Sequence, residues 1–169
     1  MNRILLVLLL FSAGLISACT KSNDVAAQIK AQGVIDDKLV TSYLNSKGLP
    51  VNHIDTTGVC YIIDTLGTGT ALFTNSTQVT VSYTGQLLKT DGTLGVVFAN
   101  TDTVQVHPSY PLGGVIKGWQ LGIPEIKTGG AVTLFVPSRY AYGPYPQATL
   151  GLPANAVLIF HIKLYNIIN

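Results

Sequence analysis

The sequence predicts an α+β domain with an antiparallel sheet and one short helix, preceded by a separate helical segment. Polar and apolar side chains alternate over residues 78–88 and again over 156–168, as they do in half-buried strands. Apolar residues recur at helical spacing over 24–47 and, for a shorter stretch, over 114–121. Short strands separated by turn-rich segments favour antiparallel pairing between them.

The first predicted element is a helix over residues 24–47. Asp24 can cap its start, and 47–50 supplies a basic last turn, a glycine stop and a proline breaker. Gly33 weakens the middle, so two short helices are an alternative to one. We interpret the segment as a spacer that packs loosely on the domain or on a partner subunit, rather than as a catalytic element. Its apolar face is formed by Val25, Ile29, Leu39 and Tyr43.

After Pro50 the pattern changes to the period of two that strands show. A turn over 90–93 separates the second strand from the third, and Pro137 ends the fifth. The one short helix is predicted at 114–121, between the fourth strand and the fifth. The predicted strands cover 58–66, 78–88, 96–98, 103–106, 131–136 and 156–168.

Residues 1–18 are predicted to be a signal peptide. A basic residue is followed by an apolar run over 4–11, which is too short to span a membrane, and the segment ends in small residues. Cys19 directly follows Ile-Ser-Ala, which resembles the lipobox of bacterial lipoproteins, where the cysteine is acylated and becomes the first residue. The alternative is an ordinary secretory signal cut near Ala18. The resemblance implies lipid anchoring in the bacterial cell envelope, and Thr20 after the cysteine favours the outer membrane, facing the periplasm.

Composition and charge exclude several classes of protein. Only 11% of the residues are charged and 47% are hydrophobic, which excludes an intrinsically disordered chain. The formal net charge is +2 and there is no basic run, so no nucleic-acid partner is expected. The three histidines are isolated and the sequence lacks nucleophile-elbow and phosphate-loop motifs, so we expect no metal and no cofactor. Cys60, inside an apolar run, is expected to be a buried, inert thiol.

A set of aromatic and aliphatic residues in turn-rich contexts remains as the candidate site. Three tyrosines fall within 140–145, next to Gly143, Pro144 and Pro146, and loops of this kind often line a pocket. The alternative interpretation is that the whole set belongs to the core. The set comprises Tyr83, Phe98, Val115, Ile116, Trp119, Tyr140, Tyr142, Leu152 and Phe160.

In this order, these residues resemble the FKBP-type peptidyl-prolyl cis-trans isomerases. The resemblance runs from about residue 58 to residue 167 and rests on four motifs in register. It implies a twisted antiparallel sheet wrapped around one short helix, the segment 115–121, and an isomerase that acts on X-Pro bonds. The motifs are Val-Ser-Tyr83-Thr-Gly-Gln-Leu, Gly-Val115-Ile116-Lys-Gly-Trp119, Tyr140-Ala-Tyr142-Gly143 and Leu152-Pro153-Ala-Asn-Ala-Val-Leu-Ile-Phe160.

The resemblance also assigns roles to single residues. Trp119 would form the floor of an apolar pocket, and the Ile116 N–H and the Tyr142 hydroxyl would bind substrate carbonyls. The family commonly has an Asp after the Phe of the third strand, where this chain has Ala99, and Tyr110 is expected to supply the aromatic group of that wall. The implied catalytic residues are Tyr83, Phe98, Ile116, Trp119, Tyr142 and Phe160, with Val115, Tyr110 and Leu152 binding substrate.

Together these observations predict a peptidyl-prolyl isomerase that assists the folding of exported proteins in the bacterial envelope, with their proline-containing segments as substrates. The chain divides into a signal peptide (1–18), a tether and helical spacer (19–50) and an isomerase domain (51–169). A homodimer through the N-terminal helix is a candidate assembly. Because Ala99 replaces an acid, the alternative is a catalytically weak or inactive binding lipoprotein with chaperone function. A second alternative is a structural lipoprotein whose pocket is filled by tyrosines 110 and 145.

Overall fold

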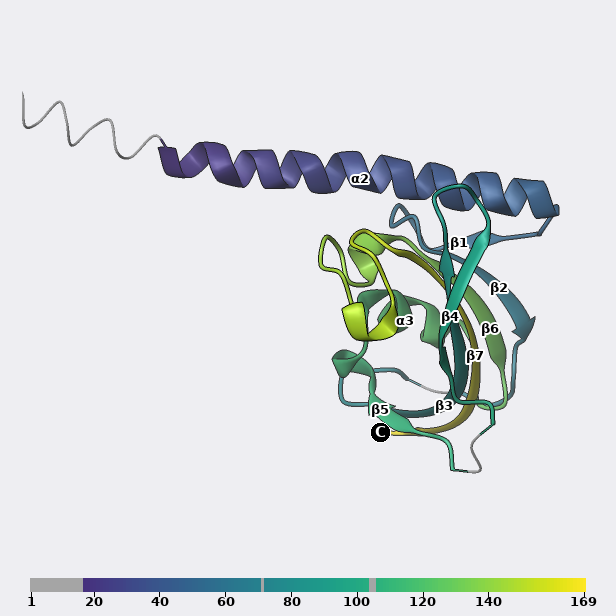
Figure 1. Ribbon diagram of the computed structural model, residues 1–169. Helices are drawn as coiled ribbons and strands as arrows, with labels where there is room; N and C mark the ends of the chain where they lie inside the picture. Colours follow the sequence, from purple (N-terminus) through teal and green to yellow (C-terminus); the bar gives the residue numbers. More distant parts are fainter. Residues whose placement is uncertain (1–16, 71, 104–105) are drawn as a thin grey trace, which may run out of the picture.

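The computed structural model describes residues 17–70, 72–103 and 106–169, and for 17–24 the backbone alone. The predicted signal peptide, up to residue 16, and the Cys19 side chain therefore lie outside the described part. A long helix, α2, precedes a sheet domain that holds one short α-helix, α3 (Figure 1). The bounds are α2 Ser17–Lys47, β1 Asn52–His53, β2 Cys60–Thr65, β3 Gln78–Leu88, β4 Leu94–Asn100, β5 Ser109–Pro111, α3 Lys117–Gly122, β6 Ala131–Val136 and β7 Val157–Ile168.

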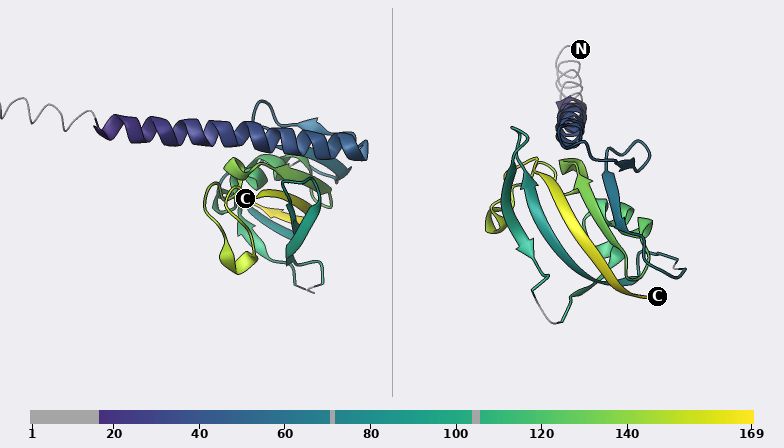
Figure 2. Two further views of the ribbon diagram at one scale, coloured as in Figure 1. Left: turned by 45° about the horizontal axis from the view of Figure 1, so that its top comes forward. Right: turned by 90° about the vertical axis from the view of Figure 1, so that its right-hand side faces the viewer.

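Within the described residues, seven strands form one antiparallel sheet in the order β1-β2-β6-β7-β3-β4, with β5 paired to β3 beside this path. The pair β3–β7 is the longest, running from Gln78 opposite Ile168 to Leu88 opposite Val157. The sheet bends so that one face curls around α3 (Figures 1 and 2). This arrangement confirms the predicted α+β architecture, an antiparallel sheet wrapped around a short helix after an N-terminal helix.

The concave face of the sheet and α3 enclose the main core. The helix lies close to β6 because glycines face that strand. A Cβ on Gly118 would come within 2.4 Å of a Val136 methyl group, and one on Gly122 would come within 2.4 Å of a Leu134 methyl group. The short helix is therefore seated deep in the curl of the sheet, which leaves Trp119 only 4% exposed. The alternation predicted for the last strand is confirmed by the buried side chains of Leu158, Phe160, Ile162 and Leu164.

Helix α2 covers the opposite face of the sheet at one end, which is the first of the two packing partners, the domain or a partner subunit, that the sequence left open. Val40 and Leu44 are 1% and 3% exposed. They pack on side chains that alternate with those of the main core, so both faces of β6 and β7 are buried here. The C-terminal half of α2 is thus docked firmly, where loose packing was expected. This second cluster also contains Cys60, Leu88, Phe135, Val157 and Ile159.

Helix α2 is longer and more continuous than the sequence suggested. It begins at Ser17 rather than at residue 24 and passes through Gly33 without a break. Gly33 is buried against a side chain of the sheet domain, since a Cβ there would lie 3.0 Å from Nη1 of Arg139. Val25 and Ile29, expected on a packed face, are 54% and 45% exposed. Both belong to the N-terminal half of α2, and Figure 1 shows the N-terminal end of this helix projecting past the sheet. Neither α2 nor any other described helix combines the length and apolar character that crossing a membrane requires.

The strand predicted at 103–106 is wrong at both of its described ends, and residues 104–105 lie outside the described part of the chain. Its described residues lie in a turn and a bend, and the strand of this region is β5, Ser109–Pro111. β5 pairs with the start of β3, where Tyr110 lies opposite Val79, and the Val81 N–H donates to the Pro108 carbonyl at 3.0 Å. Pairing with β3 therefore selects the segment that carries Tyr110 in place of the β-branched run before it.

Candidate active site

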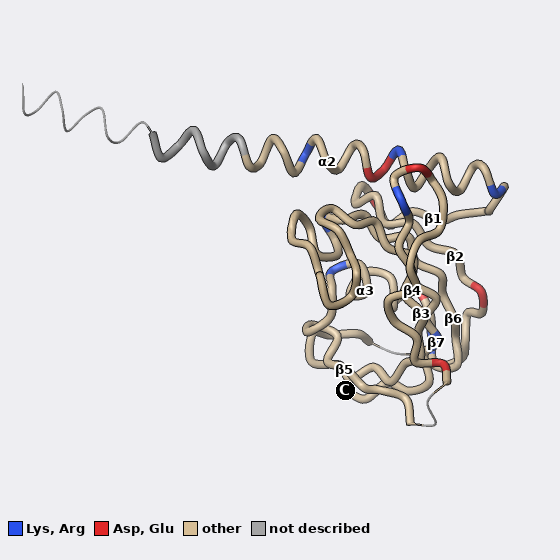
Figure 3. Tube along the Cα trace, in the orientation of Figure 1, with Lys and Arg blue, Asp and Glu red and all other residues tan. Residues whose placement is uncertain are grey.

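A cavity of about 350 Å³ opens between α3, the concave face of the sheet and the loop that follows β6. This volume is in the range of small-ligand pockets. The described lining contains no charged side chain, and Figure 3 shows the charged positions dispersed over α2, the start of α3, the strands and the turns. The lining residues are Tyr83, Phe98, Ala99, Tyr110, Gly114, Val115, Ile116, Trp119, Tyr142, Leu150 and Phe160.

Trp119 of α3 is the centre of an aromatic cluster. Its ring centroid lies 4.7 Å from that of Tyr83 and 5.3 Å from that of Phe160, with the planes at 83° and 88°. Tyr110 approaches from β5, 6.4 Å away and at 74°. Edge-to-face contacts of this kind contribute stabilising energy beyond that of the surface area they bury. The indole Nε1 is buried and has no hydrogen-bond partner among the described residues.

Another wall of the cavity is formed by the Phe98 side chain of β4, whose ring packs over Gly85 of β3. The Phe98 ring centroid lies 5.7 Å from that of Phe160 at 89°. Gly85 makes this contact geometrically possible, since a Cβ at that position would come within 2.6 Å of Phe98 Cζ and 3.1 Å of Phe160 Cε1. The glycine of the Tyr-Thr-Gly motif therefore provides the space into which the Phe98 ring fits.

Two polar groups stand at the edge of this apolar cavity. The Ile116 carbonyl accepts hydrogen bonds from the Trp119 and Gln120 N–H groups at 3.0 and 3.2 Å, whereas its own N–H has no backbone partner in the described part of the chain. The Gln120 side chain stabilises the backbone just before Ile116 by donating to the Val115 carbonyl at 2.8 Å. The Tyr142 hydroxyl is protonated at neutral pH, as any tyrosine is, and can donate; burial raises its pKa further above the ordinary value of 10.0.

Ala99 lines the cavity at the position where the resemblance led us to expect an acid. Asp102 does not replace it, because its Oδ2 accepts a hydrogen bond from Thr84, whose side chain lies on the face of β3 opposite Tyr83. In the absence of an acid, the neighbour of the Tyr83 hydroxyl is another phenol. Burial, together with the nearby Tyr110 hydroxyl, raises the pKa of Tyr83 to about 12.

The cavity brings together all of the implied catalytic and substrate-binding residues except Leu152. Tyr140 of the candidate set is not in the lining and packs against the core, and the Cys19 side chain lies outside the described residues. Leu152 is 3% exposed and belongs to the core, where its N–H and carbonyl both bond to Gln147. The cavity is lined instead by Leu150, at the end of a 3-10 turn over Ala148–Leu150. The sequence did not indicate Leu150, because a 3-10 turn has no periodic pattern that would show which of the two leucines faces the cavity and which the core. Tyr145 is 71% exposed and is not in the lining, so it does not fill the cavity.

The chain is similar to a known protein family and to several of its members. The model of the FKBP-type peptidyl-prolyl cis-trans isomerase family matches residues 69–165. The isomerase FkpA of Buchnera aphidicola from Acyrthosiphon pisum is 37% identical over 112 residues, 66% of this chain and 43% of its own. FkpA of Escherichia coli K12 is 32% identical over 151 residues, 89% of this chain and 51% of its own. The chain thus spans about half the length of these relatives.

A shorter relative and two solved structures complete the comparison. FK506-binding protein 1 of Gibberella zeae is 39% identical over 93 residues, 53% of this chain and 81% of its own. The crystal structure of Escherichia coli FkpA matches with a TM-score of 0.61 and 32% identity, covering 98% of this chain and 72% of that one. A peptidyl-prolyl isomerase from Pseudomonas syringae matches with a TM-score of 0.64 over 83% of this chain and 96% of its own, and at 24% identity this likeness concerns the fold alone.

Proposed function

Because this chain belongs to the FKBP-type peptidyl-prolyl cis-trans isomerase family, we propose that it catalyses the cis–trans isomerisation of X-Pro bonds in polypeptides. The observation that carries the proposal is the uncharged cavity of about 350 Å³, with the Trp119 indole at its centre and aromatic rings on its walls. A prolyl ring is apolar and lacks an N–H, so an aromatic cavity of this size can hold it without leaving a donor unpaired.

The reaction requires no nucleophile and no acid or base. Rotation about a peptide bond is opposed by a barrier of about 18–20 kcal/mol, because twisting removes the amide resonance. A site lowers this barrier if it binds the twisted amide more tightly than the planar one. The twisted amide has a smaller dipole and loses less when it is desolvated, so transfer from water into the cavity favours it. The aromatic lining therefore supplies the first part of catalysis.

The two polar groups at the edge of the cavity supply the second part. We assign the Ile116 N–H and the Tyr142 hydroxyl as donors to the substrate carbonyls that flank the prolyl ring. Two donors on separate segments hold the chain on both sides of the rotating bond, which orients it for the twist. The Tyr142 hydroxyl is protonated at neutral pH, as this role requires.

A second candidate function is that of a binding protein with little or no isomerase activity. The observation that favours it is Ala99, which lines the cavity where an acid is common in the family. With an alanine there, the cavity keeps its apolar lining and loses one polar group that could act on the twisted amide. Such a protein would hold proline-containing segments of unfolded clients and serve as a chaperone.

An isomerisation assay separates the two functions. The rate of cis-to-trans conversion of a short X-Pro peptide is measured with increasing protein, with and without an FKBP-directed macrolide. For an isomerase we expect a rate that rises with protein concentration and falls when the macrolide occupies the cavity. A rate equal to the uncatalysed one, together with binding of the peptide, would reject the isomerase and support the binding protein.

The setting of the protein is also a proposal. The signal-like residues 1–18 and the lipobox-like Cys19 support a lipid-anchored protein of the bacterial envelope, and Thr20 favours the outer membrane with the domain facing the periplasm. In that compartment the substrates are exported proteins, whose slow X-Pro isomerisation limits folding. The exposed side chains of Val25 and Ile29 support a homodimer through the projecting end of α2. On this proposal the helical spacer ends near residue 50, and the isomerase domain covers 51–169.

A further inference from the structure

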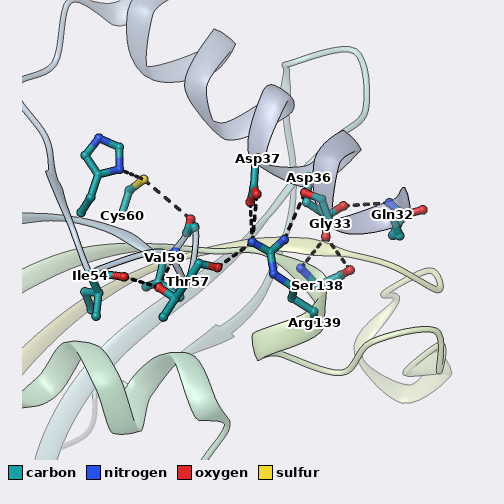
Figure 4. Close-up of polar contacts among 12 residues, drawn as sticks. Gln32, Gly33, Asp36, Asp37, Ile54, Thr57, Val59, Cys60, Ser138 and Arg139 are labelled. Carbon is teal, nitrogen blue, oxygen red and sulfur yellow. Dashed lines mark hydrogen bonds and ion pairs between the residues drawn. The ribbon is translucent and has the colours of Figure 1, made fainter. Parts of the chain in front are cut away.

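A buried carboxylate on α2 contacts the segment that carries Tyr142. Asp36 is 1% exposed, and Figure 4 shows its side chain directed at Ser138, which directly follows β6 and Pro137. Its Oδ2 accepts from the Ser138 N–H at 2.9 Å and from the Ser138 hydroxyl at 2.6 Å. Its Oδ1 accepts from Gln32 Nε2 at 2.8 Å. These hydrogen bonds stabilise a charge that would otherwise be costly to bury.

Among the described residues this carboxylate forms no ion pair, although Arg139 directly follows its partner Ser138. The Arg139 guanidinium pairs instead with Asp37, 2.8 Å away, and donates to the carbonyls of Gly33 at 3.1 Å and Thr57 at 2.6 Å (Figure 4). Asp36 and Asp37 therefore have different partners and separable effects. An apolar residue such as Val40 on the same face docks the helix, but at position 36 it would leave the Ser138 N–H and hydroxyl without their acceptor. Docking alone thus gives no reason for a carboxylate at this position.

The partner of Asp36 is the residue that fixes the turn around Tyr142. Ser138 starts a 3-10 turn over Ser138–Tyr140, and its carbonyl accepts from the Ala141 N–H at 2.9 Å and the Gly143 N–H at 2.8 Å. Tyr142 thus lies between two residues whose N–H groups bond to Ser138. The residues that follow, 144–146, are exposed. The turn is held at Ser138 and, beyond Tyr142, by the hydrogen bond that the Asn155 N–H donates to the Gly143 carbonyl at 2.8 Å.

We propose that Asp36 is a positioning residue of the active site: acting through Ser138, it holds the Tyr142 hydroxyl where it donates to the bound substrate. The inference rests on the proposed function and extends it, because it makes α2 a component of the catalytic unit. The carboxylate engages both the backbone N–H and the hydroxyl of Ser138, which fixes the orientation of that residue. Because Ser138 is fixed, its carbonyl is also fixed, and this carbonyl accepts the two hydrogen bonds that hold the turn around Tyr142.

A double-mutant cycle on the full chain tests this inference. Asp36→Ala is expected to lower kcat about tenfold with little change in KM, since a displaced donor mainly affects the twisted state. In a Tyr142→Phe background, which has no hydroxyl to position, the same substitution is expected to change kcat less than twofold. Asp36→Asn keeps an acceptor for the Ser138 N–H and should retain most of the activity. Equal losses in both Tyr142 backgrounds would reject the proposal, because they would show a general structural effect.

Asp37→Ala is the matched control, one residue along the same helix. It removes the ion pair to Arg139 but leaves the two carbonyl acceptors and all contacts of Asp36, so kcat should change less than twofold. A loss as large as that of Asp36→Ala would overturn the proposal. If Asp36→Ala does not fold, the cycle is run with Ser138→Ala, which removes one hydrogen bond to Asp36, and the same non-additivity with Tyr142→Phe is required.

A measurement of peptide affinity separates the test of the Asp36 role from the test of isomerase activity. The affinity for an X-Pro peptide is measured for the same set by the fluorescence of Trp119, the single tryptophan of the chain. If the wild-type chain binds the peptide without isomerising it, the enzyme proposal fails, and the cycle in affinity then decides the role of Asp36. Additive effects on affinity reject the positioning role, and non-additive effects support it. A chain that neither binds nor isomerises the peptide overturns both proposals.

Discussion

The rings of Tyr83 and Trp119 meet at 83° with their centroids 4.7 Å apart. One comes from the central strand β3 and the other from α3, so the contact joins the sheet to the helix at the bottom of the cavity. Edge-to-face pairs at this distance contribute about 0.5–1.5 kcal/mol beyond the area they bury. The floor and one wall of the cavity are therefore a single packed unit, and a change in either is expected to alter the shape of the site.

Replacing Trp119 tests the cavity floor. Trp119→Leu should weaken binding of an X-Pro peptide by about tenfold or more, because a large aromatic contact surface is lost at the centre of the site. Leucine is preferred to alanine, since truncating a buried aromatic to alanine costs roughly 3–5 kcal/mol of stability. Calorimetric titration provides the affinity. Tyr145→Leu is the control, because Tyr145 is 71% exposed and outside the cavity, and its affinity should stay unchanged. Unchanged affinity in a folded Trp119→Leu protein would place the peptide elsewhere.

Restoring an acid at position 99 tests whether its absence limits catalysis. Ala99→Asp should raise kcat roughly three- to tenfold while peptide affinity rises less, because a positioned polar group acts mainly on the twisted state. The comparison is Asn100→Asp, which adds the same charge at the neighbouring, exposed position. Kinetics and binding are measured on both variants. If the two variants behave alike, the effect is one of net charge, and the alanine does not limit the rate.

The docking of α2 should be visible in the stability of the whole chain. Leu44→Ala removes a side chain that is 3% exposed in the second cluster, and we expect a loss of about 2–4 kcal/mol in the free energy of unfolding. Val34→Ala on the same helix removes a side chain that is 65% exposed, and its effect should stay within about 0.5 kcal/mol. Urea unfolding monitored at two wavelengths gives both values. Equal, small effects would mean that α2 is not docked.

The Cys60 thiol should make stability fall at alkaline pH. Burial, and secondarily the charge of Asp37, raises its pKa from the ordinary 9.0 to about 11. Between these values the unfolded chain has lost the proton and the folded chain has kept it, so the unfolded state binds fewer protons and stability decreases as the pH rises. The free energy of unfolding is measured from pH 8 to pH 11. Cys60→Ala, which has no thiol at this site, should show a shallower decrease, and parallel curves would contradict the assignment.

The lipid anchor is tested by replacing the cysteine that would carry it. Cys19→Ser should abolish acylation and shift the protein from the membrane fraction to the soluble fraction, or leave it unprocessed, because acyl chains supply the membrane affinity. Fractionation followed by mass determination of the N-terminus distinguishes these forms. Cys60→Ser serves as the control, since it removes the other thiol of the chain and should leave the protein in the membrane. Wild-type membrane recovery of Cys19→Ser would contradict lipid anchoring.

The sequence by itself determined most of the strands and most of the residues that line the cavity. The alternation over 78–88 and the apolar run over 131–136 gave strands with the bounds that β3 and β6 have. These patterns are local, because strand periodicity and turn residues act over a few positions. The positions of Trp119 and Tyr142 came from motifs whose order along the chain is enough to identify them.

Tertiary structure decided the features that depend on distant partners. Residues 103–106 have a β-branched pattern, yet the edge of β3 pairs with Ser109–Pro111, and Leu150 rather than Leu152 faces the cavity. Asp36 and Ser138 are 102 positions apart, and no periodicity relates them. Which acid is buried, and which residue it holds, depends on the packing of Val40 and Leu44 against the back of the sheet. Contacts between segments far apart in the chain depend on how the whole chain packs to bury its apolar surface. Local sequence patterns therefore do not predict them.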